Sequence, residues 1–172
     1  MAISASDYVV SSYVPTIGSL LRVPTPIAYP STCSTKPFEM MVVVQPKTLP
    51  YANQELQKIA SHVPHECLVK LGVPGAPATV NEVTSHLSAV SMAHFACHGE
   101  QNKENPLDSS LILEDGRLKI SRIMQESTPN ASLAVLCACE TAMGDEDLPD
   151  EVMHLGATLL FAGFRGVVAT MW

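Results

Sequence analysis

The sequence predicts one α/β domain with a mostly parallel central sheet and helices on both of its faces. Short apolar segments rich in β-branched residues alternate along the chain with amphipathic segments of helical period. Two of the apolar segments also end abruptly in His or Cys beside small residues, as buried parallel strands do when they deliver reactive groups to their carboxyl ends. Right-handed crossovers between such strands place helices on both faces.

The first 37 residues differ in composition from the rest of the chain. A short strand is expected at residues 7–13 and a short helix at residues 15–22, both at the edge of the domain. Residues 23–37 hold four prolines among Ser and Thr, which opposes both a helix and a central strand. This segment is therefore expected to be an exposed loop, and residues 38–172 to form the core of a single domain.

The core elements follow from their apolar patterns and their boundary residues. Thr79 and Glu82 have the spacing of a capping box, which predicts the start of a helix. Asp115-Gly116 favours a type I′ turn between two short strands. The polar run from Glu100 to Asn105 is typical of a loop. The expected strands are residues 40–44, 66–71, 92–96, 111–114, 117–120, 133–136 and 166–171, and the expected helices are residues 53–63, 79–90, 121–125 and 150–161.

The last residues, 167–172, are too apolar for an uncovered end of a parallel sheet. We therefore expect the chain to be a fragment of a longer protein.

Composition excludes several classes of partner. The formal net charge is −7 with only ten Lys and Arg, so no cationic face for nucleic acid is expected. No apolar stretch has the length of a membrane span, and residues 1–4 do not begin a secretory signal. Five cysteines without framework spacing indicate a reducing compartment, so we expect a cytoplasmic protein.

Two residues offer the chemistry of nucleophilic acyl transfer. Cys139 follows the apolar segment at residues 133–136, and His98 follows the one at residues 92–96. A thiolate can attack a carbonyl carbon while the imidazole accepts the thiol proton and later protonates the leaving amine. The main-chain N–H groups of Gly99 and Cys139 are expected to form the oxyanion hole.

The blocks Phe95-Ala96-Cys97-His98-Gly99 and Cys137-Ala138-Cys139-Glu140-Thr141, with residues 156–172, resemble the CHAT domain, a caspase- and separase-like cysteine peptidase family. The resemblance covers roughly residues 40–172 and, more weakly, residues 8–21. It implies a caspase-like three-layer sandwich, with His98 as the base and Cys139 as the nucleophile. No metal or organic cofactor is implied.

The expected function is a cysteine endopeptidase that acts on a protein substrate and is regulated by further regions of the protein or by a partner. Acidic residues are frequent just after Cys139, and an acidic rim favours a substrate with Arg or Lys before the cut. Glu140 and Asp145 are candidates for this pocket. The same acidic residues also suit a solvated loop and a helix N-terminus.

Three alternatives remain open. Cys137 competes with Cys139 as the nucleophile, although the family pattern favours Cys139 and leaves Cys137 as a small buried hydrophobe. The domain can also be a non-catalytic regulatory or interaction module, because a fold does not imply a function. Finally, a metal site is conceivable if neighbouring strands bring several ligands together, namely His94, Cys97, His98, Cys137 and Cys139, but the spacing of known zinc motifs is absent.

Overall fold

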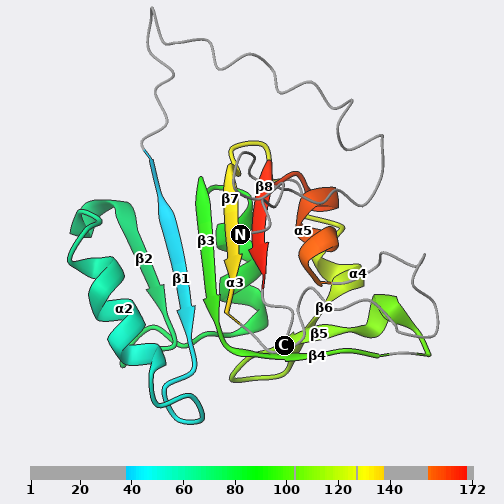
Figure 1. Cartoon of the computed structure of the whole chain (residues 1–172), viewed down its shortest axis with the longest axis horizontal. Coiled ribbons are helices and arrows are strands. Elements are labelled where there is room, and N and C mark those ends of the chain that lie inside the picture. Colours follow the sequence, from blue (N-terminus) through cyan, green and yellow to red (C-terminus); the bar gives the residue numbers. More distant parts are fainter. Residues whose placement is uncertain (1–37, 103, 127, 138–154, 170–172) are drawn as a thin grey trace, which may run out of the picture.

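A computed structural model of the chain describes residues 38–102, 104–126, 128–137 and 155–169, and its centre is a five-stranded parallel sheet (Figure 1). The strand order is β2-β1-β3-β7-β8, and every neighbouring pair is parallel. The strands are β1 (Met40–Val44), β2 (Leu68–Leu71), β3 (Met92–Ala96), β7 (Leu133–Leu136) and β8 (Gly166–Ala169).

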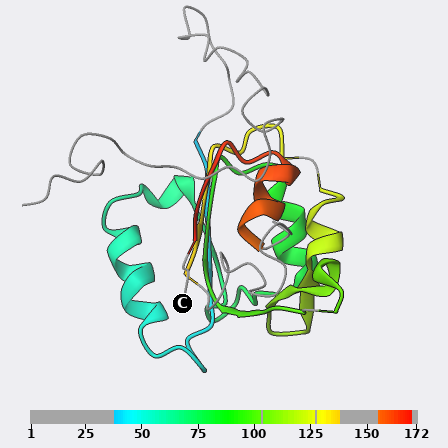
Figure 2. The same cartoon turned by 45° about the vertical axis from the view of Figure 1, so that its right-hand side comes forward.

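Helices cover both faces of this sheet, as Figure 2 shows. Helix α2 (Ala52–Ala60) lies on one face, and α3 (Val80–Leu87), α4 (Ile120–Ile123) and α5 (Leu155–Ala162) lie on the other. The structure thus confirms the three-layer α/β architecture that the alternating pattern predicts.

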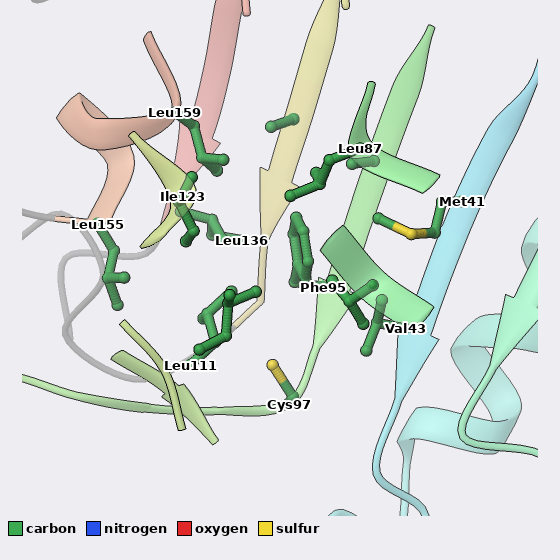
Figure 3. Close-up of a cluster of buried hydrophobic side chains, with 14 of the residues drawn as sticks. Met41, Val43, Leu87, Phe95, Cys97, Leu111, Ile123, Leu136, Leu155 and Leu159 are labelled. Atoms are coloured by element: carbon green, nitrogen blue, oxygen red, sulfur yellow. The ribbon is translucent and has the colours of Figure 1, made fainter. Parts of the chain in front are cut away.

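The continuous apolar strands are explained by burial on both faces. All five residues of β1 are buried, and they alternate between two hydrophobic clusters. Met41 and Val43 pack in the larger cluster beside Phe95 of β3, on the side of α3 and α5 (Figure 3). Val42 and Val44 pack in the smaller cluster against α2. A strand with helices on both sides needs apolar residues at every position.

A second, antiparallel sheet follows β3 directly. It contains β4 (His98–Glu100), β5 (Ser110–Ile112) and β6 (Arg117–Lys119), in that order. Figure 1 places it at the carboxyl ends of the parallel strands, below α4 and α5. Leu111 and Leu118 face each other in this sheet and are fully buried in the larger cluster.

The predicted hairpin forms, but its turn differs from the expectation. Residues 113–116 form a four-residue loop, and Leu113 N–H donates to the Gly116 carbonyl at 2.8 Å. The side chains of this loop form hydrogen bonds at the start of α3. The Asp115 carboxylate accepts from Val80 N–H at 2.8 Å, and Glu114 accepts from Ala78 N–H at 3.1 Å. These bonds satisfy N–H groups at the start of the helix, which a type I′ turn would not do.

Other boundaries shift by a few residues. The expected strand from residue 66 begins with a 3-10 turn, η2 (His65–Cys67), and the expected helix at 121–125 is the shorter α4. Glu100 lies in β4, so the expected polar loop begins one residue later, and a second 3-10 turn, η3 (Pro106–Asp108), follows it. Thr79 caps α3 as predicted, since its hydroxyl accepts from Glu82 N–H at 3.2 Å. The elements expected at 7–22, the first residues of 150–161 and the last of 166–171 lie outside the described residues.

Candidate active site

His98 lies where the chain leaves the main sheet and enters the small one. Strand β3 ends at Ala96, and β4 begins at His98 with Ile112 of β5 as its antiparallel partner. The histidine is half-buried, so part of the residue remains open to solvent. This is the place at the end of a parallel strand that the sequence predicts for the general base.

Gln45, the first residue after β1, fixes the backbone at His98. Its main-chain N–H donates to the Ala96 carbonyl at 3.1 Å, which extends the pairing of β1 with β3. Its side-chain oxygen Oε1 then accepts from the His98 N–H at 3.2 Å. Gln45 is not among the predicted site residues, although a polar residue directly after a fully buried strand is a signal for this edge of the sheet.

Gly99, the expected oxyanion donor, is the middle residue of β4 and pairs with Leu111. It is half-buried beside His98. The described structure therefore places both predicted residues of this block at the carboxyl end of the parallel sheet.

The second block approaches the first through the pairing of β7 with β3. Leu136 is the register partner of Phe95, and Cys137 N–H donates to the Phe95 carbonyl at 2.8 Å. The two strands thus run side by side up to the residues that precede the predicted dyad. Cys139 follows two residues after Cys137, and it lies outside the described residues, as do Glu140 and Asp145.

Cys137 has an unexpected environment. The sequence predicts a small buried hydrophobe there, but the residue is only half-buried and its sulfur lies near two polar side chains. The Sγ atom, a ring nitrogen of His94 and a carboxylate oxygen of Glu55 all lie within 4.8 Å of one another. The prediction for Cys137 is therefore wrong: it belongs to a polar cluster on the α2 face of the sheet.

The electrostatics of this cluster hold the thiol in its neutral form. Burial, together with the nearby Glu55 carboxylate, raises the pKa of Cys137 to about 11. Burial lowers the pKa of His94, and the charge of Glu55 opposes this shift. A thiol with such a high pKa is a poor nucleophile at neutral pH, which argues against Cys137 as the attacking group.

Cys97 is also unsuited to nucleophilic chemistry. It is fully buried in the larger hydrophobic cluster, where Figure 3 shows its side chain near Phe95 and Leu111. Burial raises the pKa of this thiol to about 12. Cys97 and His94 face opposite sides of β3, as the alternation of strand residues predicts. The five-ligand metal site considered above is thus not assembled: Cys97 is on the wrong face.

Glu55 was missed by the sequence analysis, although the pattern of α2 contains a signal. Ala52 and Leu56 are the buried residues of this helix, and Glu55 lies beside them, on the same side as the half-buried Ile59. A carboxylate on the apolar stripe of a helix indicates a polar partner in the layer beneath it. That partner is His94, whose Nε2 atom lies 3.2 Å from Oε1 of Glu55.

Comparisons with known proteins agree with the fold and with the motif blocks. The family model of the CHAT domain matches residues 5–172, nearly the whole chain. A search of curated proteins found no match. In the part of the chain that the structure describes, no helix is both long enough and apolar enough to cross a membrane.

Proposed function

Because the chain belongs to the CHAT domain family, a caspase-like peptidase family, we propose that it is a cysteine endopeptidase with Cys139 as nucleophile and His98 as general base. The observation that carries this proposal is the convergence of two strand ends. The pairing of β3 with β7 continues through the Cys137 N–H bond to Phe95, so His98 and Cys137, the first residue of the second block, follow neighbouring strands at the same edge of the sheet.

The proposed reaction uses only groups of this chain and water. His98 accepts the thiol proton of Cys139, and the thiolate attacks the scissile carbonyl carbon. The main-chain N–H groups of Gly99 and Cys139 stabilise the resulting oxyanion. The imidazolium then protonates the leaving amine, and a water molecule, activated by the same ring, hydrolyses the acyl-enzyme. No cofactor is needed for these steps.

A matched pair of cysteine variants tests the nucleophile. Cys139→Ala should abolish cleavage of a protein substrate, whereas Cys137→Ala should retain it, because the Cys137 thiol is neutral at pH 7. The same pair can be probed with a thiol-reactive electrophile at mildly acidic pH, where only a catalytic thiolate reacts quickly. Slow, uniform labelling of all five cysteines, with no cleavage by the wild type, would instead support the non-catalytic module.

The substrate preference is proposed from charge. Six acidic residues follow the nucleophile closely, and no Lys or Arg occurs between Cys139 and Arg165. Carboxylates such as those of Glu140 and Asp145 pair best with a guanidinium, so cleavage after Arg or Lys is expected. A positional peptide library measures this preference, and selection of Asp, Glu or an apolar residue at that position would refute it.

Regulation by further regions or by a partner is also proposed. A peptidase of this kind would be harmful if it were always active, so we expect the 172-residue chain to be weakly active by itself. The measurement is the cleavage rate of the chain alone against that of the complete protein. Equal rates would contradict this part of the proposal.

A further inference from the structure

We propose that Glu55, His94 and Cys137 form a Zn²⁺-binding site between α2 and the central sheet. The three residues come from three elements: α2, the middle of β3, and the position directly after β7. The proposal is independent of the peptidase function, because none of its ligands takes part in the proposed reaction.

The separations fit a zinc ion after small movements of the side chains. One ligand atom of each residue lies within 4.8 Å of the other two, and His94 Nε2 and Glu55 Oε1 are 3.2 Å apart. Tetrahedral zinc with bonds of about 2.0 to 2.3 Å holds its ligand atoms about 3.3 to 3.7 Å apart. Side-chain rotations are enough to bring the ligand atoms from their observed separations to those around zinc. Glu55 is free to make such a rotation, because it lies on a surface helix and its side chain is 38% exposed.

A second sign of a ligand is the nitrogen of His94, which is poorly satisfied although Glu55 lies beside it. The side chain of His94 is only 7% exposed, and its Nε2 atom has no hydrogen-bond partner of good geometry among the described residues. The nearby Glu55 oxygen is close enough for an ion pair but is not aligned for a hydrogen bond. Buried polar atoms are rarely left without partners, and a bound cation would satisfy this one.

The types of donor atom select the metal. A thiolate, an imidazole and one carboxylate form a mixed set of the kind that zinc accepts, with water as a fourth ligand. Mg²⁺ and Ca²⁺ prefer sites made of oxygen alone. Because Glu55 and Cys137 are both partly exposed, the site is open on one side for this water and for entry of the ion.

Binding of Zn²⁺ by these side chains is coupled to the release of a proton. Burial lowers the pKa of His94, and burial together with Glu55 raises the pKa of Cys137. Neutral imidazole is the form that binds zinc. When Zn²⁺ enters, a sulfur–zinc bond forms, and the thiol proton passes to solvent. The site then holds two negative ligands against the two positive charges of the ion.

The site differs from the dyad in position. His94 points to the α2 face of β3, where Val42 and Ala96 pack, whereas His98 lies beyond the end of that strand in the small sheet. Matched variants can therefore show at which of the two places zinc binds. Zinc held by the dyad would depend on Cys139 and His98, and zinc held by the α2-face site would depend on Glu55, His94 and Cys137.

The experiment titrates the 172-residue chain with Zn²⁺ by calorimetry, in a Cys139→Ala background that removes the competing thiol. One equivalent of zinc should bind and release about one proton at pH 7, measured by comparing buffers of different ionisation enthalpy. Glu55→Gln, His94→Gln and Cys137→Ser should each weaken binding at least about tenfold, since loss of a direct ligand costs at least as much as loss of a supporting residue. His98→Gln and Cys67→Ser are the controls, and they should bind zinc like the background protein.

Co²⁺ gives a second readout, which reports directly whether a thiolate is bound to the metal. A cobalt–thiolate charge-transfer band should be present in the Cys139→Ala protein and absent after Cys137→Ser. If His94→Gln or Cys137→Ser fails to fold, as judged by circular dichroism, zinc binding by Glu55→Gln still tests the proposal, because Glu55 is half-exposed. Absence of stoichiometric binding, binding unchanged by Glu55→Gln, or loss of binding in His98→Gln would each overturn the proposal.

Discussion

At the scale of single residues, the proposed site depends on groups that support His98 without reacting. Gln45 is the clearest example, because one residue joins β1 to β3 through its backbone and holds the His98 N–H with its side chain. The bond spans 53 positions of sequence, so it fixes the start of β4 relative to the main sheet. We assign Gln45 as a positioning residue for the base.

Replacing Gln45 by Leu should lower kcat on a protein substrate about fivefold, because loss of one hydrogen bond of about 1 kcal/mol leaves the His98 backbone less well fixed. KM should change little, since Gln45 is not proposed to contact the substrate. Gln45→Glu keeps an acceptor oxygen and should restore most of the rate. Steady-state kinetics of the three proteins test this, and an equal loss in both variants would count against a positioning role.

At the scale of elements, the same edge of the sheet depends on a close approach between β1 and the turn after β2. Gly72 follows β2 with a φ of +89°, and a Cβ atom added there would lie 1.8 Å from the carbonyl oxygen of Val44. Only glycine fits this position. Val44 is the last residue of β1 and directly precedes Gln45. The packing of this turn against Val44 therefore helps to fix the position of Gln45, the residue that supports His98.

Gly75 provides a matched control for this contact. Its φ of +85° is nearly the same, but an added Cβ would meet no atom within 4 Å. Gly75→Ala should therefore cost about 1 kcal/mol of unfolding free energy from backbone strain alone. Gly72→Ala carries the same strain plus a clash with backbone, and should cost at least about 2 kcal/mol more. Urea titrations of the two variants measure the difference, and equal losses would disprove the clash.

The sequence predicts an element best where its residues have a single environment. The strands at residues 40–44, 92–96 and 133–136 agree with the structure at both ends, because their residues are apolar and largely buried, with His94 as the exception. The hairpin turn was mispredicted, because Glu114 and Asp115 bond to residues 35 or 36 positions away. No local turn preference contains that information.

The candidate site, like the fold, could be predicted from the sequence only in part. His98 and Gly99 could be placed at a strand end, since a motif and a strand boundary coincide there. The cluster of Glu55, His94 and Cys137 could not be foreseen in full, because its members are brought together by the packing of α2 and by the order β1-β3-β7 in the sheet. Strand order is a property of the whole fold, which no single segment encodes.

At the scale of the whole molecule, the two sheets are joined at Cys97. This residue lies between β3 and β4, and its side chain is buried in the cluster that also contains Leu111 of the small sheet and Phe95 of the main one (Figure 3). Ionisation of this thiol would place a charge in the buried junction between the sheets. We therefore expect the stability of the domain to depend on the protonation of this sulfur atom.

The sign of this linkage predicts a loss of stability in alkaline solution. Burial raises the pKa of Cys97 from 9.0 to about 12, so the native protein keeps a proton that the unfolded chain releases above pH 9. Between these two values the unfolding free energy should fall with rising pH, by about 1.4 kcal/mol per pH unit for this thiol alone. Below pH 9 both states hold the proton, and Cys97 contributes no slope. Cys97→Ala should be less stable at neutral pH because of the cavity, yet its stability should fall less steeply above pH 9. Urea titrations of both proteins across this range measure the two slopes, and parallel slopes would show that the ionisation of Cys97 is not linked to unfolding.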